Sequence, residues 1–347
     1  MSEPFLNGII EGFYGREWDW SARLAYADYL LDSGLNSYIY CPKSDPWLRK
    51  RWQQPWPSEM QSQLEALQQS YAERGLNWGV GLSPYALYTD YSAAARRHLQ
   101  AKISGLNQLG GSLLAILFDD MPGDCPDLAA RQAEILADVC AWSQASTVLA
   151  CPTYYSHDPV LETHFGAMPQ GYWESLGSLL PREVGVFWTG NRVCSETVSC
   201  GDLELITELM GRKPVLWDNY PVNDGAKASQ FLHLEPLPGR EEGLAGALSG
   251  HFCNPMNQAW LSRYPLSGLA RLYGGRASTW EDCFGAELAA QLRRDQAGFE
   301  QLGLTGLDAG ERQELLLCYR QFDHPAAAEV CDWLEGKYAF DPACLTG

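Results

Sequence analysis

The sequence contains no run of lysine and arginine, and its 25 basic residues are outnumbered by 43 acidic ones, which gives a net charge of −18. Nucleic acids and anionic membranes are held mainly by basic patches that displace counterions. There is also no apolar stretch near the roughly 20 residues that a membrane-spanning helix needs. These absences predict a protein that binds neither nucleic acid nor membrane.

The N-terminal residues MSEPFLNGII have no basic segment followed by an apolar one, so no signal peptide is expected. The 11 cysteines are odd in number and stand singly, several of them in apolar stretches, which is typical of buried thiols in a reducing compartment. Cys194 and Cys200 are close enough in sequence to form a disulfide, and the sequence leaves that pairing open. A cytoplasmic location is therefore expected.

Motifs for metal ions and for nucleophilic catalysis are scarce. The six histidines are spread out, and neither HExxH, nor a CxxC pair with zinc spacing, nor GxSxG is present. Asp119, Asp120 and Asp124 spell DDxxxD, a pattern of Mg²⁺ sites for diphosphates, but Pro122 and Gly123 interrupt the helix that such a site needs. We therefore predict no metal and no cofactor, with DDxxxD as the minor alternative.

Short apolar runs alternate with segments of helical spacing along most of the chain, which indicates βαβ units and a parallel sheet. Eight units in about 255 residues predict an α/β fold of the (β/α)8 TIM barrel type. A doubly wound sheet is the alternative, but its usual first turn, GxGxxG, is replaced here by EGFYGREW. The expected strands are Asn7–Phe13, Asn36–Cys41, Trp78–Leu82, Leu113–Phe118, Thr147–Cys151, Val184–Trp188, Pro214–Trp217 and Ala247–Cys253.

Helical spacing continues without further strands in the last quarter of the chain. Met256–Tyr273 fits the last barrel helix, and three later helices would form a small appendage. Within the barrel, Ser58 and Pro126 stand where an N-cap and a first-turn proline belong. We expect a catalytic barrel over residues 1–275 and a C-terminal helical region over residues 276–347. The other expected helices are Ser21–Asp32, Ser58–Arg74, Ser92–Leu109, Pro126–Gln144, Ala286–Leu302, Gly310–Phe322 and Pro325–Glu335.

Barrel enzymes carry their chemistry at the carboxyl ends of the strands. There the sequence places carboxylates, amides, one lysine and aromatic rings, which suit a neutral, hydroxyl-rich ligand with one apolar face, a sugar. Each residue alone could be structural, since Asx turns and packed rings are common, but seven strand ends carry the same chemistry. These residues are Glu11, Gly12, Tyr14, Gly15, Arg16, Lys43, Asp119, Asp120, Tyr154, Tyr155, Trp188, Thr189, Asn191, Trp217, Asp218, Asn219, Asp224 and Asn254.

The adjacent acids Asp119 and Asp120 do not fit the usual glycosidase pair, whose two carboxyls come from different strands and face each other across the bond. Neighbouring side chains in a strand point to different sides. One acid could therefore reach the glycosidic oxygen while the other reaches a different atom of the same sugar. If that atom is an acetamido nitrogen, the substrate supplies its own nucleophile, a known exception to the two-carboxylate scheme.

Seven segments occur in the order GIIEGFYGREW, YIYCPKSDPW, ILFDDM, CPTYY, VFWTGN, LWDNYPVND and HFCNP. Together they resemble glycoside hydrolase family 84, the O-GlcNAcases and bacterial β-N-acetylglucosaminidases. The resemblance spans roughly residues 7 to 260 and stops before the helical region. It implies a TIM barrel, retention of configuration and an oxazoline intermediate.

The resemblance also implies a role for each matching residue. Asp119 would orient the acetamido group, Asp120 would be the general acid and base, and Tyr155 would donate a hydrogen bond to the forming oxazoline or the leaving group. Asp224 would bind the 4- and 6-hydroxyls of the sugar. The other implied substrate-binding residues are Trp217 as a pocket wall, Asn219 at the acetamido group, and Gly12 by its backbone, Lys43 and Asn254 at the remaining hydroxyls.

The leading hypothesis is a cofactor-independent retaining β-N-acetylglucosaminidase that removes terminal GlcNAc from a glycoside or glycoprotein. One alternative is a hydrolase of hyaluronan-like or other amino-sugar polymers, which would need an open cleft, and the acidic chain disfavours a polyanion. The other is a catalytically idle GlcNAc-binding protein, although both acids are present. The sequence predicts no oligomeric state.

Overall fold

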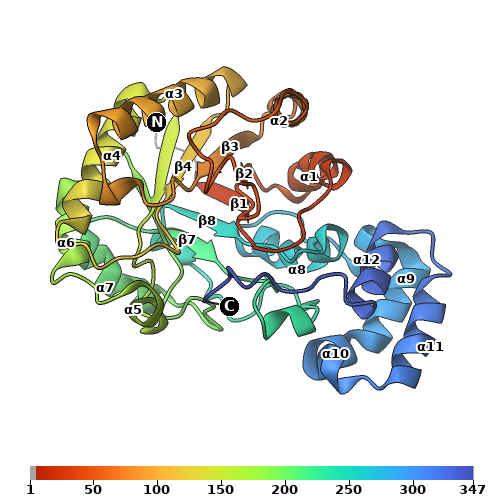
Figure 1. Ribbon diagram of the computed structural model, residues 1–347. Helices are drawn as coiled ribbons and strands as arrows, with labels where there is room; N and C mark the ends of the chain where they lie inside the picture. Colours follow the sequence, from red (N-terminus) through yellow and green to blue (C-terminus); the bar gives the residue numbers. More distant parts are fainter. Residues whose placement is uncertain (1–4, 347) are drawn as a thin grey trace.

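The computed structural model describes residues 5–346, and the chain forms a closed barrel of eight parallel strands in sequence order (Figure 1). Each strand pairs with the next, and β8 pairs with β1 through Leu6 opposite Gly250 and its neighbours. This arrangement confirms the expected (β/α)8 barrel. The strands are β1 (Leu6–Glu11), β2 (Ser37–Tyr40), β3 (Asn77–Leu82), β4 (Leu113–Leu117), β5 (Thr147–Cys151), β6 (Gly185–Trp188), β7 (Val215–Asp218) and β8 (Gly250–Cys253).

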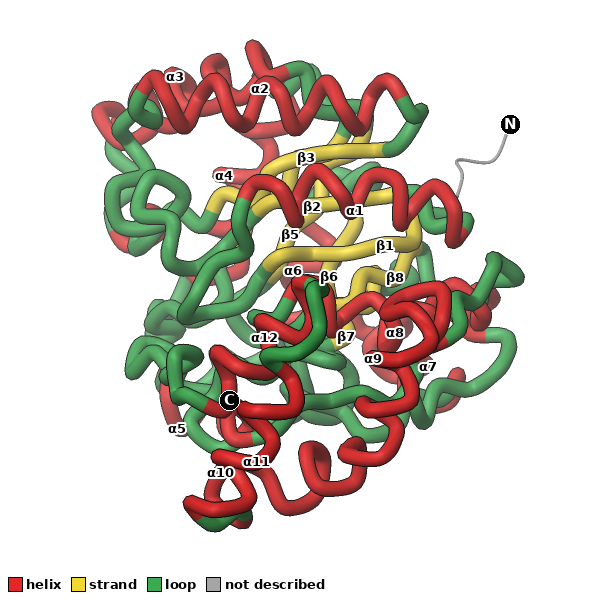
Figure 2. Tube along the Cα trace, turned by 90° about the vertical axis from the view of Figure 1, so that its right-hand side faces the viewer, coloured by secondary structure: helices red, strands yellow, loops and turns green. Residues whose placement is uncertain are grey.

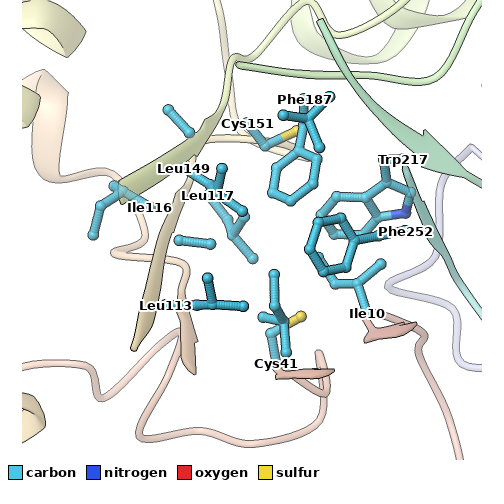
Figure 3. Packing of buried hydrophobic residues seen from close by; sticks show 14 of the residues in the cluster. Ile10, Cys41, Leu113, Ile116, Leu117, Leu149, Cys151, Phe187, Trp217 and Phe252 are labelled. Atoms are coloured by element: carbon cyan, nitrogen blue, oxygen red, sulfur yellow. The ribbon is translucent and has the colours of Figure 1, made fainter. Parts of the chain in front are cut away.

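Helices surround the strands in an outer layer, so both faces of the sheet are buried (Figure 2). This explains why the strands are almost continuously apolar. Inside the barrel, Phe187 packs edge to face on Trp217 and on Phe252, with ring centroids 5.3 and 5.8 Å apart (Figure 3). The barrel helices are α1 (Trp20–Ser33), α2 (Ser58–Glu73), α3 (Ala93–Leu109), α4 (Leu128–Trp142), α5 (Val160–Phe165), α6 (Tyr172–Leu179), α7 (Cys200–Met210) and α8 (Ala259–Leu272).

The C-terminal helices build a second hydrophobic core beside α8. Glu329 fixes this region to the barrel, because its carboxylate accepts hydrogen bonds from the first amides of α8, Trp260 N at 3.0 Å and Leu261 N at 2.9 Å. The proposed division between residues 275 and 276 falls in the turn between α8 and α9. The later helices are α9 (Trp280–Ala297), the π-helix η4 (Gly298–Leu302), α10 (Gly303–Gly306), α11 (Ala309–Tyr319) and α12 (Pro325–Leu334).

Several helix starts and caps differ from the expectation, and α8 begins at Ala259 instead of Met256. Ser58 is the first residue of α2 rather than its N-cap, and Pro126 lies in the turn before α4. The ninth helix begins at Trp280 instead of Ala286, because the Thr279 side chain caps it and a kink at Gly285 interrupts the helical spacing. Among the described residues, three short 3₁₀ helices lie in loops at Leu87–Thr89, Ala228–Gln230 and Leu244–Gly246, and β8 begins at Gly250, three residues after the expected start at Ala247.

None of the helices within residues 5–346 combines the length and the hydropathy of a membrane span. The thiols of Cys194 and Cys200 do not form a disulfide, which answers the question that the sequence left open. The expected absence of a signal peptide concerns a segment that begins in residues 1–4, outside the described part of the chain.

Candidate active site

A pocket opens at the carboxyl ends of the strands, where barrel enzymes place their chemistry. It leaves a cavity of about 50 Å³. All nine residues that the sequence assigned to catalysis or substrate binding line it, together with one tyrosine that had no assigned role and two residues from the C-terminal segment. The lining residues are Gly12, Tyr14, Lys43, Asp119, Asp120, Cys151, Tyr155, Thr189, Val193, Cys194, Trp217, Asn219, Val222, Asp224, Asn254, Cys344 and Thr346.

Some predicted strand-end residues point away from this pocket. Alternate residues of a strand face opposite sides, so Glu11 and Asp218 lie on the outside of the barrel. There Glu11 pairs with Arg23, whose Nε lies 3.0 Å from Oε2, and Asp218 accepts a hydrogen bond from Arg240 Nε at 2.8 Å. The hydroxyl of Tyr154 donates to the Gly166 carbonyl at 2.7 Å. Glu11 thus ties β1 to α1, whereas Asp218 and Tyr154 bind residues outside the strands, and none of the three lines the pocket.

Asp119 and Asp120 both line the pocket, although neighbouring side chains of an extended strand would diverge. The reason is the backbone of Asp120, which has a φ of 55° in the left-handed region. Aspartate is among the few side chains that tolerate this conformation, at a cost of roughly 1–2 kcal/mol. The strand therefore ends in a turn that brings two carboxylates to one ligand. Both acids thus lie at one pocket, as the prediction of one shared sugar requires, and the different atoms that they reach remain a prediction.

Asp119 presents two oxygens with different surroundings. Its Oδ2 forms an ion pair with the ammonium of Lys43, and both side chains are buried. Its Oδ1 is also buried and has no hydrogen-bond partner among residues 5–346. A buried carboxylate oxygen without a donor costs free energy, so this atom indicates a donor that a ligand would supply. Lys43 was expected at a sugar hydroxyl, but here its ammonium binds Asp119.

Asp120 is held by two tyrosines. Tyr155 donates its hydroxyl to Oδ1 at 3.0 Å, and Tyr14 donates to Oδ2 at 2.8 Å. Burial, followed by the charge of Asp119, raises the pKa of Asp120 above its ordinary value. A raised pKa keeps the carboxyl protonated closer to neutral pH, as a general acid needs, and the two hydroxyls stabilise the carboxylate that remains after proton transfer. Tyr155 thus contacts Asp120 directly.

Two groups at this site had no role from the sequence. Tyr14 was noticed only as a strand-end aromatic residue, and Arg49 was not noticed at all. Arg49 lies in the loop after β2, where its Nη2 donates to the backbone carbonyl of Asp120 and its Nη1 donates to Ser83 Oγ, both at 2.9 Å. Arg49 therefore holds the left-handed residue by its backbone carbonyl, and the charge of Arg49 lowers the pKa of Asp120.

We expect Arg49→Met to change the pH profile of catalysis as well as its rate. Loss of the guanidinium removes a charge that lowers the pKa of Asp120, so the basic limb of kcat/KM should move to higher pH. Loss of the hydrogen bond to the Asp120 carbonyl should lower kcat on unactivated substrates by about tenfold. The pH profiles of kcat/KM for wild type and variant check this.

Arg49→Lys is the matched control for that variant, because it keeps the charge and loses the forked geometry. It should lower kcat while leaving the basic limb close to that of the wild type. A basic limb that stays in place in Arg49→Met would show that the charge of Arg49 does not act on Asp120.

One wall of the pocket is formed by residues that hydrogen bonds of the Asn219 and Asn254 side-chain amides link to one another. Asn254 accepts from Gly12 N at 3.1 Å and donates to Asn219 Oδ1 at 3.0 Å, which also accepts from Trp217 Nε1 at 2.9 Å. Asn219 Nδ2 donates to the Val193 carbonyl at 2.8 Å. Gly12 must be glycine here, because a Cβ would lie 2.3 Å from the Trp217 ring. The wall is therefore rigid before any ligand binds.

Asp224 closes the pocket on the side of Tyr14. Its Oδ2 accepts the Tyr14 backbone amide at 2.7 Å, so one residue bridges Asp224 and Asp120. Burial raises the pKa of Asp224 to about 6, and the charge of Asp120 adds to the shift. Three carboxylates thus face one small space with Lys43 as their buried cation.

Within the described residues, Asp218, His251 and Cys253 bring potential metal-ligand atoms within 4.8 Å of one another. Both oxygens of Asp218 are already bound by Arg240, and Oδ2 also lies 3.0 Å from His251 Nε2. Although burial alone would raise it, the charge of Arg240 and these hydrogen bonds hold the pKa of Asp218 below its ordinary value. Arg240 fills the place that a metal cation would take. Asp124 of the DDxxxD pattern does not line the pocket.

A sequence model described as beta-N-acetylglucosaminidase matches residues 7–283. The chain belongs to the β-N-acetylglucosaminidase family. The resemblance to glycoside hydrolase family 84 is thereby confirmed, and the matched region extends slightly beyond the barrel.

Individual relatives agree with this membership. The proteins named protein O-GlcNAcase from Rattus norvegicus and Mus musculus are each 29% identical over 260 residues, which is 72% of this chain. The chain covers 28% of the length of either relative. The solved structure of an aspartate-to-asparagine variant of the Thermobaculum terrenum O-GlcNAc hydrolase has a TM-score of 0.78 at 27% identity, with 95% of this chain and 81% of that one covered.

Proposed function

We propose that this family member is a retaining β-N-acetylglucosaminidase that hydrolyses terminal β-linked GlcNAc by substrate-assisted catalysis. One observation carries the proposal: the buried Oδ1 of Asp119 lacks a donor among the described residues, beside an Asp120 whose pKa is raised. An acetamido N–H would supply that donor. A sugar without the acetamido group would leave the oxygen unsatisfied.

Asp119 would hold the acetamido group so that its carbonyl oxygen attacks the anomeric carbon, while Asp120 gives its proton to the leaving oxygen. The oxazoline is then opened by a water that Asp120 deprotonates, which restores the starting state with retention of configuration. Lys43 holds Asp119 in place through their ion pair. Positioning the internal nucleophile can contribute about 7–11 kcal/mol to lowering the barrier. The rigid amide wall and Asp224 would hold the sugar during both steps.

The test is hydrolysis of 4-nitrophenyl β-N-acetylglucosaminide beside the matching β-glucoside, with and without EDTA. Cleavage of the acetamido sugar alone, unaffected by EDTA, supports the proposal. Cleavage of both sugars at similar rates would contradict the role of the acetamido group. If neither is cleaved while N-acetylglucosamine still binds, the idle sugar-binding alternative replaces the proposed reaction.

Side chains and backbone from several strand ends surround the pocket on different sides, which supports a terminal sugar over an internal unit of a polymer, since a polymer needs an open cleft. A GlcNAc-bearing glycoside or glycoprotein is therefore the proposed substrate, as in the names of the relatives. We also propose a cytoplasmic location, supported by the unpaired Cys194 and Cys200.

Substrate binding should depend on the ionisation of Asp224. Because its pKa is raised to about 6, the carboxyl is neutral below that pH and accepts charge-assisted hydrogen bonds from sugar hydroxyls only above it. KM should therefore fall as the pH rises through about 6. Asp224→Asn should raise KM by about 10- to 100-fold at neutral pH and abolish this inflection. KM measured between pH 4.5 and 8 for the wild type and for Asp224→Asn tests this prediction. If the inflection persists in the variant, it comes from an ionisable group other than Asp224.

A further inference from the structure

The segment that follows α12 returns to the barrel and reaches the active-site pocket (Figure 1). It leaves the helical region at Tyr338 and runs along the loop after β1, where the Ala339 carbonyl comes close to Gly15. Its last described residues supply two side chains to the pocket lining, Cys344 and Thr346. A region with no place in the proposed reaction thus contributes to the reaction's own pocket.

The beginning of this segment is fixed to the catalytic loop. Arg16, two residues after Tyr14, forms an ion pair with Asp332 at 2.7 Å and stacks on the ring of Tyr338 at 4.7 Å. Lys337 also binds Asp332 at 2.8 Å. These contacts aim the following residues at the barrel mouth, where a turn closed by the Cys344 amide and the Asp341 carbonyl, 2.9 Å apart, directs the chain inward.

Inside the pocket, Thr346 lies near enough to Tyr155 to act on the pKa of its hydroxyl, and Tyr155 is the tyrosine that donates to Asp120. The cavity left beside it is about 50 Å³, which holds roughly three to five waters, whereas an N-acetylglucosamine unit has about 15 non-hydrogen atoms. The sugar and the segment therefore need the same space.

We propose that Asp341–Thr346 is an internal competitor of the substrate, which occupies the pocket in the resting protein and leaves it when the sugar binds. This rests on the proposed function of the same pocket. An internal competitor reduces the apparent affinity by the fraction of molecules that are open and leaves the rate of the bound complex unchanged. The segment therefore sets KM rather than kcat.

Opposite charges at position 346 test the competition in the full-length chain. Thr346→Asp places a carboxylate beside Asp119, Asp120 and Asp224, so the segment should leave the pocket and KM for 4-nitrophenyl β-N-acetylglucosaminide should fall about threefold or more. Thr346→Lys places a cation there and should raise KM by a similar factor. Both substitutions should change KM and leave kcat unaltered, and the change in KM should become smaller as salt is added.

Leu345 provides the matched control, because its side chain is exposed and does not line the pocket. Leu345→Asp and Leu345→Lys should leave KM within about twofold of the wild type. Equal KM values in all four variants, or a rise in KM for both Thr346 variants, would overturn the competition. The second of these results would make the segment a part of the sugar site.

Calorimetric titration with N-acetylglucosamine separates this proposal from the reaction. The free sugar should bind more tightly to Thr346→Asp and more weakly to Thr346→Lys, whether or not any variant hydrolyses the aryl glycoside. A protein that binds the sugar in this order without hydrolysis would contradict the proposed reaction and support the competitor. Hydrolysis of the aryl glycoside with the same sugar affinity in all variants would support the proposed reaction and contradict the competitor.

Discussion

Asp120→Asn is expected to lower kcat/KM on an alkyl or peptide β-N-acetylglucosaminide by about 10²- to 10⁴-fold, the usual contribution of a general acid. An asparagine in the same place keeps a hydrogen bond with Tyr14 or Tyr155 but has no proton to give to the leaving oxygen. An aryl glycoside with a low-pKa leaving group needs no such proton. The loss of kcat/KM on that substrate should therefore be far smaller, and comparing the two substrates measures the acid role.

The control for this comparison is Asp124→Asn. Asp124 belongs to the same DDxxxD pattern and has an exposed side chain outside the pocket, so its substitution should change neither substrate's kcat/KM. Equal losses on alkyl and aryl substrates in Asp120→Asn would mean that the residue acts by position or charge and not as an acid. If Asp124→Asn lowers kcat/KM as much as Asp120→Asn does, the result would instead favour a metal site at Asp119, Asp120 and Asp124.

The barrel and the pocket-lining residues could be predicted because both follow from which short segments are strands and which residues come directly after them. A parallel barrel brings every strand's carboxyl end to one face, so residues that directly follow strands meet without knowledge of their contacts. Gly12, Lys43, Asp119 and Asn254 converge in this way although they are far apart in sequence. Position at a strand end is not enough by itself, because side chains alternate between the two faces of a strand. Glu11 and Asp218 also stand at strand ends, but their side chains face the outside of the barrel.

What the sequence did not predict depends on contacts between distant segments. Arg49 meets the carbonyl of Asp120 across 71 positions, and Tyr14 meets its carboxylate across 106. No periodicity or motif records such pairs. The left-handed backbone of Asp120 is similarly hidden, because aspartate adopts it only when a turn requires it. The return of Thr346 to the pocket depends on the docking of a whole helical region.

The second large effect is expected for Asp119→Asn, which should lower kcat by about 10²- to 10³-fold on aryl and alkyl substrates alike. The physical reason is the count of acceptors. Asp119 offers two acceptor oxygens, one to the ammonium of Lys43 and one to the proposed acetamido N–H. Asparagine has one acceptor and one donor, so in either orientation its NH₂ group faces a donor.

The two orientations have different consequences that kinetics and melting can separate. If the amide oxygen faces Lys43, the fold keeps its buried contact and the substrate meets an N–H where it needs an acceptor, so kcat falls at a nearly unchanged Tm. If the amide oxygen faces the pocket, Lys43 loses its partner, and a buried unpaired cation lowers stability by about 3–5 kcal/mol. Tm and kcat measured on one preparation distinguish these cases. Near-normal turnover of both substrates at an unchanged Tm would remove Asp119 from the mechanism, because no orientation of the amide satisfies both donors.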